Sequence, residues 1–291
     1  MQTAEAELPF QKQRMSLELY RKVIDDVAEF PDWLKILRLS QHGEPLLHPE
    51  LPEMIRYAKE RGVSEFIEIV TNGSRLNPEL NEQLVASGLD RIRISIEEIS
   101  REGYRRMAGA NIDFDQLLFG IRDLYERSVR AGNPCEVYVK TVDAAVDTKE
   151  KEETFYRLFG DICHRIWIDH IVPAWAGWEE LGKRFDLQQT GIHGQVSHEI
   201  KVSPFPFYSP SVAPDGIVTV CCADWQRKLV VGDLTRQSLL EVWNGESLRT
   251  FWTDMLSGHG DRYEMCAHCK YPKYNSTDNI DSYAEKILKR M

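Results

Sequence analysis

The sequence predicts an α/β protein with a parallel sheet, followed by a small domain that contains most of the cysteines. Over the first 175 residues, short apolar strands alternate with amphipathic helices, which is the pattern of right-handed βαβ units. From Gly177 this alternation stops, and four of the six cysteines lie beyond it. We therefore expect an open parallel sheet, or a sheet curled into part of a (β/α) barrel, in residues 1–176. A connector in 177–202 and a second domain in 203–291 would follow.

Each element of the first domain is indicated by a local pattern. A helix is expected over 15–30, where apolar side chains recur at helical spacing behind an N-cap at Ser16. Two further helices each end at a glycine, Gly62 or Gly88. Apolar or alternating segments predict five strands, at 35–40, 65–71, 91–96, 136–142 and 165–172. The helices between them are expected at 49–61, 77–87, 114–131 and 149–159.

The second domain is predicted to be small and irregular. Residues 203–275 are rich in proline, aromatic residues and cysteine, with short strand candidates at 216–220 and 229–231. One helix is expected over 238–255, and a charged helix over 281–290 ends the chain. A domain of this composition has a small core, so we expect it to draw part of its folding free energy from a bound metal.

Composition excludes several classes of protein. The net charge of −10, with basic residues interspersed among acidic ones, argues against nucleic-acid binding, which needs a basic face. No apolar run approaches the length of about 20 residues that a membrane span requires, and the N-terminal sequence has no signal-peptide pattern. Six cysteines in 291 residues are too few for a disulfide scaffold. We expect a cytoplasmic protein that binds neither nucleic acid nor membrane.

Polar residues follow several predicted strands, where parallel α/β proteins place their ligands. Gly43-Glu44-Pro45 combines a glycine, which lets a ligand approach the backbone, with a carboxylate that can bind an ammonium group. Asn72 follows the next strand, and Ser95 and Glu97 follow the third. Ordinary turns with surface side chains would look the same. The strand around Ser95 nevertheless alternates polar and apolar residues, which favours a ligand-binding inner face.

The C-terminal cysteines predict a metal site. The Cys266-x-x-Cys269 turn aims two thiolates at one point, and the Cys221-Cys222 pair can supply further sulfur ligands. Sulfur ligands select zinc or iron–sulfur clusters. A reduced thiol pair or a redox motif remains an alternative for one Cys-x-x-Cys. Because successive residues of a strand point to opposite faces, we expect only one of the adjacent cysteines to bind the metal.

These strand ends resemble the radical S-adenosylmethionine superfamily. The resemblance rests on Gly43-Glu44-Pro45 with the following LLHPELPEMIRYAKERG, and on Thr71-Asn72-Gly73 and Ser95-Ile96-Glu97. The resemblance implies a barrel-type fold in which Gly43 and Glu44 hold the methionyl amino group of S-adenosylmethionine. It further implies that Asn72, Ser95 and Glu97 contact its ribose or carboxylate, and that Lys140 meets the same ligand.

The C-terminal region resembles the SPASM domain, which carries auxiliary iron–sulfur clusters. The matching segments are PFPFYSPSVAPDGIVTVCCADW, LLEVWNGESLR and the CAHC that contains Cys266 and Cys269. The resemblance implies one auxiliary 4Fe–4S cluster. The candidate ligands are Cys221, Cys222, Cys266 and Cys269, of which Cys221 or Cys222 together with Cys266 and Cys269 could hold a three-cysteine cluster, or the site could bind nothing. Zinc is the alternative metal, with His268 or the spare cysteine as fourth ligand.

The sequence departs from the family pattern in two places. The Cys-x-x-x-Cys-x-x-Cys that binds the radical-generating cluster does not occur in this sequence. The sequence starts about where the first helix of the family should, so we expect the first strand and its cluster loop to be missing. Ser203 stands where SPASM domains have their leading cysteine, and a serine hydroxyl is a poorer iron ligand than a thiolate. Gln41 and Glu98 also occupy positions where a small glycine would suit a ligand-contacting turn.

Three interpretations remain. The first is a truncated, degenerate or split family member that binds S-adenosylmethionine and an iron–sulfur cluster but cannot perform the radical step alone. Its substrate would be an unidentified small molecule or peptide, and a partner chain would supply the missing first strand. The second is a non-catalytic partner or ligand-binding protein with a zinc or iron–sulfur knuckle. The third is a non-radical enzyme that uses Glu44, Glu97 and Lys140 for acid–base chemistry.

Overall fold

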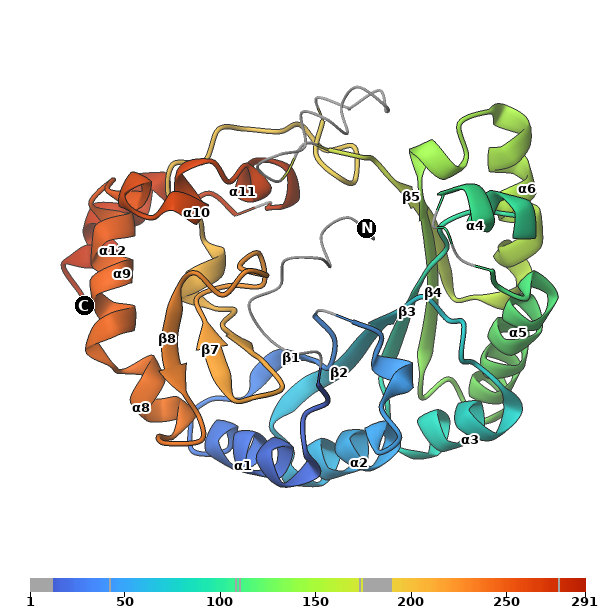
Figure 1. The fold of residues 1–291 in the computed structure, drawn as a ribbon, viewed down its shortest axis with the longest axis horizontal. Coiled ribbons are helices and arrows are strands. Elements are labelled where there is room, and N and C mark those ends of the chain that lie inside the picture. The colour runs from blue at the N-terminus through green and yellow to red at the C-terminus, as the bar shows by residue number, and fades with distance from the viewer. Residues whose placement is uncertain are drawn as a thin grey trace. The chain divides into compact units, whose positions relative to one another are not determined.

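The described part of the chain forms two compact units, each with its own sheet (Figure 1). A computed structural model describes residues 13–41, 43–107, 109, 111–172, 174, 190–276 and 278–291. Unit 1 contains Tyr20–Asp169, and unit 2 contains His170–Met291 together with a short N-terminal segment. The predicted connector falls largely outside the described residues, and its described part, 190–202, has neither helix nor strand.

Unit 1 is built on five parallel strands that lie in the sheet in the order of the sequence. They are β1 (Leu34–Arg38), β2 (Ser64–Thr71), β3 (Arg91–Ser95), β4 (Glu136–Val142) and β5 (Arg165–Asp169). Because each strand pairs with the next one along the chain, every connection is a crossover, and all five carboxyl ends meet at one edge. The predicted parallel α/β sheet is confirmed; the last strand is shorter than expected and ends at Asp169.

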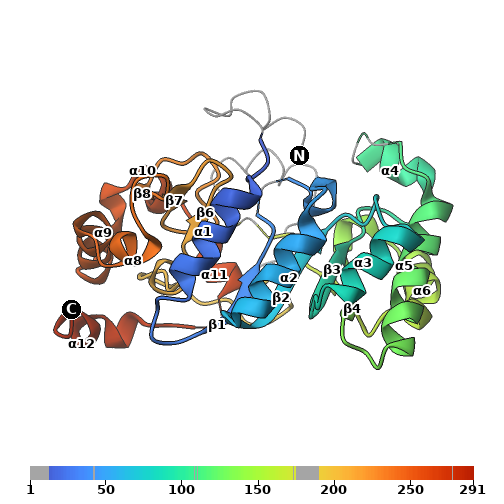
Figure 2. The same ribbon diagram turned by 90° about the horizontal axis from the view of Figure 1, so that it is seen from below.

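The helices of unit 1 lie along one face of this sheet (Figures 1 and 2). They are α2 (Leu51–Arg61), α3 (Pro78–Ala86), α5 (Phe114–Arg130) and α6 (Lys149–Phe159), and α1 (Leu17–Val27) precedes the first strand. Side-chain N-caps start four of them: the predicted Ser16 accepts from Leu19 N, Asn77 from Leu80 N, Asp113 from Gln116 N and Thr148 from Lys151 N. A short helix that the sequence did not predict, α4 (Arg101–Met107), follows β3.

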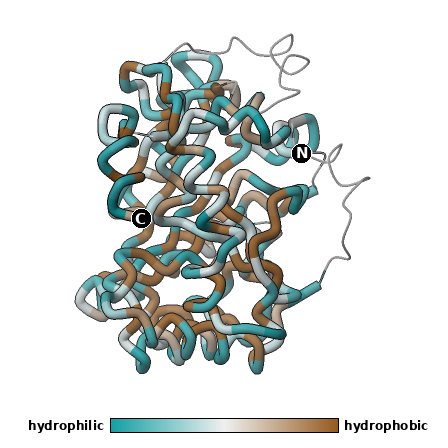
Figure 3. The backbone as a smooth tube through the Cα atoms, turned by 90° about the vertical axis from the view of Figure 1, so that its left-hand side faces the viewer, coloured by the Kyte–Doolittle hydropathy of each residue, from teal (hydrophilic) through white to brown (hydrophobic). Residues whose placement is uncertain are grey.

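The two faces of the sheet differ in chemistry because strand residues alternate. The helix-covered face is apolar and fully buried: Ile67, Ile69, Ile92, Ile94, Val137 and Val139 are all 0% exposed. The opposite face carries charged and aromatic side chains on the same strands. In Figure 3 hydrophobic stretches of backbone alternate with hydrophilic loops and turns, as expected of amphipathic elements around a core.

Unit 2 contains a small antiparallel sheet of β6 (Ser211–Val212), β7 (Ile217–Thr219) and β8 (Val230–Asp233). The single helix predicted over 238–255 is wrong: α8 (Leu239–Trp243) ends at Asn244, and α9 (Glu246–Leu256) starts after Gly245, whose extended backbone (φ −71°, ψ 154°) interrupts the helix. Short helices follow, α10 (Glu264–Ala267), α11 (Tyr271–Asn275) and α12 (Ala284–Leu288). The expected charged helix begins instead as a 3-10 turn at Asp281.

The core of unit 2 gathers residues from the ends of its sequence around α9. Val202, Val220, Leu248, Phe251 and Met255 are buried together. Cys266 packs against this cluster, so the segment of the cysteine turn is held to the same core as the residue that precedes Cys221. None of the described helices combines the length and apolar character that a membrane crossing demands.

Candidate functional site

Glu44 joins the loops that follow β1 and β2. Its Oε1 accepts hydrogen bonds from Leu46 N at 3.0 Å and from the Thr71 hydroxyl at 2.5 Å. Its Oε2 accepts one from Asn72 N at 2.8 Å. The predicted candidates Glu44 and Asn72 therefore meet, as the shared edge of parallel strands requires. Thr71 was not predicted; its place at the last position of a strand, beside a candidate loop, was the signal.

Two glycines shape this strand-end site. Gly43 has a φ of +102°, and no atom lies within 4 Å of the place that a side chain would take, so its backbone faces open space. Gly73 also has a positive φ, +72°, and a side chain there would press on Ile94 and Leu117 at 3.0 Å. Both turns therefore need glycine, one for its backbone conformation and one also for close packing onto the core. His42 lies outside the described residues.

Lys140 and Ser95 lie side by side on β4 and β3, in register with one another. The Lys140 ammonium binds the carboxylate of Asp169 at 2.7 Å. Asp169 is only 1% exposed and also accepts a hydrogen bond from the indole of Trp167 at 2.8 Å. Sequence reasoning missed this carboxylate, although an acidic residue within a predicted apolar strand was the available signal.

Glu97 lies beyond the end of β3 and is exposed. Its backbone N–H donates to the Tyr104 hydroxyl at 3.1 Å, and within the described part its carboxylate makes no hydrogen bond to the other candidates. The neighbouring Glu98 is buried and accepts from Arg106 at 3.0 Å and from Ile99 N at 2.9 Å. Glu98 is thus a paired structural carboxylate at a position where the family pattern suggested glycine.

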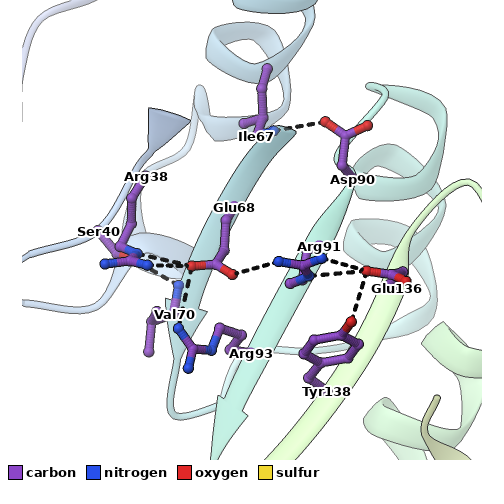
Figure 4. Close-up of polar contacts among 10 residues, drawn as sticks. All are labelled: Arg38, Ser40, Ile67, Glu68, Val70, Asp90, Arg91, Arg93, Glu136 and Tyr138. Atoms are coloured by element: carbon purple, nitrogen blue, oxygen red, sulfur yellow. Dashed lines mark hydrogen bonds and ion pairs between the residues drawn. The ribbon is translucent and has the colours of Figure 1, made fainter. Parts of the chain in front are cut away.

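A chain of charged side chains crosses the helix-free face below these residues (Figure 4). Glu68 on β2 is 1% exposed and binds Arg38 at 2.8 Å on one side. On the other side Arg91 lies 3.5 Å from Glu68 and 2.8 Å from Glu136 on β4. Burial alone would raise the pKa of the Glu136 carboxyl, but hydrogen bonds from Arg91 and Tyr138 outweigh it and hold that pKa below its usual range.

The four cysteines of unit 2 come together and are called the thiol group below: Cys221, Cys222, Cys266 and Cys269. The pKa of Cys221 is raised to about 12, mainly by burial and in smaller part by the neighbouring thiols of Cys222, Cys266 and Cys269. Burial likewise raises the pKa of Cys266 to about 12, with contributions from Cys269 and Asp224. An ion pair of 3.0 Å between Lys228 and Glu264 ties the two segments together.

The adjacent cysteines lie in a turn, not in a strand. β7 ends at Thr219, and Asp224 N donates to the Cys221 carbonyl at 3.2 Å to close the turn. The expectation that the pair points to opposite faces rested on a strand, so its premise is wrong. Ser203 is half-buried just before the 3-10 turn Phe205–Phe207.

The thiol group holds the four cysteines of unit 2, and the other two cysteines of the chain lie in unit 1. Among the described residues, no three His, Cys, Asp or Glu side chains are arranged to hold a single ion. The two remaining cysteines belong to unit 1 and are buried there; the Cys163 thiol donates to the Phe159 carbonyl at 3.1 Å. The sulfur ligands available for a metal centre are therefore those of the thiol group.

Two family models account for most of the chain. The Radical SAM superfamily model matches residues 4–144, and the SPASM model, described as an iron–sulfur cluster-binding domain, matches residues 204–270. The chain belongs to the radical SAM superfamily and carries a SPASM domain. The predicted family and fold class are thereby confirmed.

Curated relatives of this radical SAM protein are matched over part of their length. Fe-coproporphyrin III synthase of Methanosarcina barkeri is 28% identical over 181 residues, which cover 60% of this chain and 41% of the relative. PqqA peptide cyclase of Granulibacter bethesdensis is 30% identical over 106 residues, 35% of this chain and 27% of the relative. A probable GTP 3',8-cyclase of Methanococcus maripaludis is 28% identical over 150 residues, 51% of this chain and 47% of the relative. The matched segment thus spans less than half of each relative.

Solved structures share the fold of the chain. BtrN in complex with AdoMet and 2-DOIA has a TM-score of 0.54 at 15% identity, covering 95% of this chain and 86% of BtrN. SuiB of Streptococcus suis bound to S-adenosylmethionine has a TM-score of 0.58 at 10% identity, covering 93% of this chain and 67% of SuiB.

The strand-end residues and the thiol group fit the groups that the family implies. Each carboxylate oxygen offers about two lone pairs, and Glu44 Oε2 accepts one bond, from Asn72 N, so it can accept another from an ammonium group beside the open backbone of Gly43. In a 4Fe–4S cluster each thiolate binds a different iron, so the sulfurs stand further apart than around one zinc ion, where Zn–S is about 2.3 Å. The four neighbouring thiols supply the number and kind of ligands that such a cluster takes.

Proposed function

We propose that this chain binds S-adenosylmethionine at the strand ends of unit 1 and one auxiliary 4Fe–4S cluster at the thiol group of unit 2. We further propose that it does not start radical chemistry unaided. The observation that carries the proposal is the gathering of four thiols in a region that the SPASM model matches. We favour a cluster over the structural zinc of the alternative interpretation because the region matches the model of an iron–sulfur cluster-binding domain. Such a cluster, when bound, exchanges electrons with the substrate or anchors it.

At the strand ends, each candidate has a distinct proposed role. Glu44 accepts hydrogen bonds from the ligand ammonium, held in place by Thr71 and Asn72 N. Gly43 lets the ligand approach the backbone. Asn72, Ser95 and Glu97 are proposed to contact ribose or carboxylate oxygens, and Lys140 to donate from its ion pair with Asp169.

The radical step is proposed to require a cluster that residues 1–291 do not hold. The printed sequence contains no Cys-x-x-x-Cys-x-x-Cys, and its six cysteines are accounted for by the thiol group and two buried positions. We propose that a partner chain supplies that cluster together with a strand that pairs with β1, which is an edge strand of this sheet among the described residues. A peptide or small-molecule substrate is supported by relatives whose names include a peptide cyclase and a GTP cyclase.

The cluster claim is tested by anaerobic reconstitution with iron and sulfide, followed by iron, sulfide and zinc analysis. We expect about four irons and four sulfides per chain, because four thiolates hold a 4Fe–4S cluster. Cys266→Ser and Cys269→Ser should lose most of the iron. Cys163→Ser, whose sulfur donates only to a backbone carbonyl, should keep it. Uptake of one zinc and no iron would overturn the claim.

The ligand claim is tested by calorimetric titration with S-adenosylmethionine. Glu44→Gln should weaken binding by about 10- to 100-fold, because hydrogen bonds to charged groups contribute about 1.5–3 kcal/mol. Glu50→Gln is the matched control: it is exposed, and its side chain makes no capping bond. Equal affinity in wild type and Glu44→Gln would remove Glu44 from the site.

The dependence on a partner is tested with the reconstituted, chemically reduced chain. We expect no reductive cleavage of S-adenosylmethionine by this chain alone, measured by chromatography of the products. Cleavage above the rate of protein-free controls would contradict the proposal and restore an independent enzyme.

A further inference from the structure

The helix-free face of the sheet carries more cations than carboxylates. Its charged strand residues are Arg38, Arg91, Arg93, Arg165 and Lys140, against Glu68, Glu136 and Asp169. The chain as a whole has a net charge of −10, so this face runs against the overall balance. A positive surplus on one face of an acidic protein points to an anionic ligand.

The surplus of positive charge on this face comes from two arginines, Arg93 and Arg165, that have no close carboxylate of their own among the described residues. The other three cations each have a close carboxylate: Arg38 and Arg91 at 2.8 Å and Lys140 at 2.7 Å. Among the carboxylates of the described residues, Arg93 reaches only Glu68 Oε1, at 3.5 Å, and it shares that oxygen with Arg38. Arg165 is exposed, and the described part of the chain places no carboxylate in ion-pair contact with it.

Both guanidinium groups stack on one indole ring. The Arg93 guanidinium lies 5.6 Å from the centroid of Trp167, and that of Arg165 lies 5.7 Å from it. Arg165 also lies 5.9 Å from the ring of Tyr138. Stacking holds a guanidinium by its flat face and leaves its N–H edge available, and that edge binds oxyanions in a bidentate manner.

The two arginines occupy one level of the sheet. Arg93 is in register with Tyr138, and Tyr138 with Arg165. Ser95 and Lys140 lie two residues further toward the carboxyl ends, about 7 Å at the rise of a strand. The level of Arg93 and Arg165 is therefore distinct from the strand-end site.

We propose that Arg93 and Arg165 bind the phosphate dianion of a small-molecule substrate, one level below the strand-end site. The proposal rests on the proposed function, for which it names the substrate class. A phosphate monoester carries a charge of about −1.5 to −2 at neutral pH, which matches the surplus of two cations on this face. Its tetrahedral oxygens can also meet guanidinium edges from two strands, whereas a planar carboxylate is satisfied by one.

The test is titration of the full-length chain with inorganic phosphate, followed by calorimetry and by the fluorescence of Trp167 and its neighbours. Arg93→Gln and Arg165→Gln should each weaken phosphate binding by about tenfold or more, since each removes a charge-assisted bidentate contact. Arg165→Lys keeps the positive charge but not the planar guanidinium, so its affinity for phosphate should lie between that of Arg165→Gln and that of wild type. Arg157→Gln, an exposed arginine on α6, should bind as wild type.

Two outcomes would overturn the proposal. One is equal phosphate affinity in wild type, Arg93→Gln and Arg165→Gln, with thermal unfolding confirming that the variants are folded. The other is an affinity for succinate equal to that for phosphate, which would assign the face to dicarboxylates. The same samples titrated with S-adenosylmethionine separate the two proposals, because Glu44→Gln should lose that ligand and keep phosphate. Loss of phosphate binding alone would leave the proposed function standing.

Discussion

The two faces of the sheet in unit 1 are made from the same strands but differ in the burial and the chemistry of their side chains. On one face isoleucine and valine are fully buried under helices. On the other, ion pairs and arginine–aromatic stacks connect side chains that are partly exposed. Residues that contribute to opposite faces are adjacent in the sequence, such as Arg93 and Ile94 on β3. Within the five residues of β3, side chains that stabilise the core thus alternate with side chains that are available for polar contacts.

This comparison implies an energetic asymmetry. Burial of apolar surface stabilises a protein by about 25 cal/mol per Å², whereas ion pairs between partly exposed groups contribute about 0–1 kcal/mol each. Substitutions on the helix-covered face should therefore change stability, and substitutions on the charged face should chiefly change ligand binding. Glu68 is the intermediate case because it lies on the charged face but is only 1% exposed.

The largest effect is expected for Ile94→Ala. Removing a fully buried branched side chain leaves a cavity against the helices, so the free energy of unfolding should fall by about 3 kcal/mol. Urea unfolding measures this change. The matched control is Arg93→Ala, one residue away on the other face, which should cost less than about 1 kcal/mol. Equal losses in the two variants would show that the faces are not separated in this way.

A smaller effect is expected for Glu68→Gln. The substitution removes the carboxylate that Arg38, Arg91 and Arg93 share, so three cations face one another without it. We expect the free energy of unfolding to fall by about 2 kcal/mol, with partial recovery in high salt, where repulsion is screened. Urea unfolding at two salt concentrations tests this. A loss that salt leaves unchanged would indicate a packing defect instead.

The smallest effect is a dependence of stability on pH at Glu136. Its folded-state pKa is depressed, so its ion pair stabilises the protein above the unfolded-state pKa of 4.5. That contribution is lost as pH falls below 4.5 and through the lower folded-state pKa. Because the carboxylate is partly exposed, we expect less than about 1 kcal/mol. Unfolding measured between pH 6 and pH 3 should show a shallower slope in Glu136→Gln, and an identical slope would contradict the assignment.

Much of the fold was predictable because it depends on local patterns. Period-two and helical spacing located the five strands and their helices, and parallel topology implied that Glu44 and Asn72 meet at one edge. The break between α8 and α9 was missed because it depends on the extended backbone of Gly245, which hydrophobic spacing does not reveal.

The parts of the site that sequence reasoning missed depend on tertiary pairing. Asp169 neutralises Lys140 across two strands, which periodicity alone does not reveal. The Cys221-Cys222 pair looked like the end of a strand, but β7 stops at Thr219 and the chain turns. Turns of this kind are set by hydrogen bonds such as that from Asp224 N, whose partner is known only once the chain is folded.

The hydrogen bond from Asn72 N to Glu44 makes one amide a reporter on the strand-end site. Exchange of that amide hydrogen with solvent requires the bond to open, so its rate in the free protein measures how firmly the two loops are joined. A ligand ammonium that donates to the same oxygen, Glu44 Oε2, competes with Asn72 N for it and weakens the hydrogen bond from Asn72 N. Ligand capture by Glu44 would then be recorded as faster exchange at Asn72, against the slowing that binding usually produces at the backbone around it.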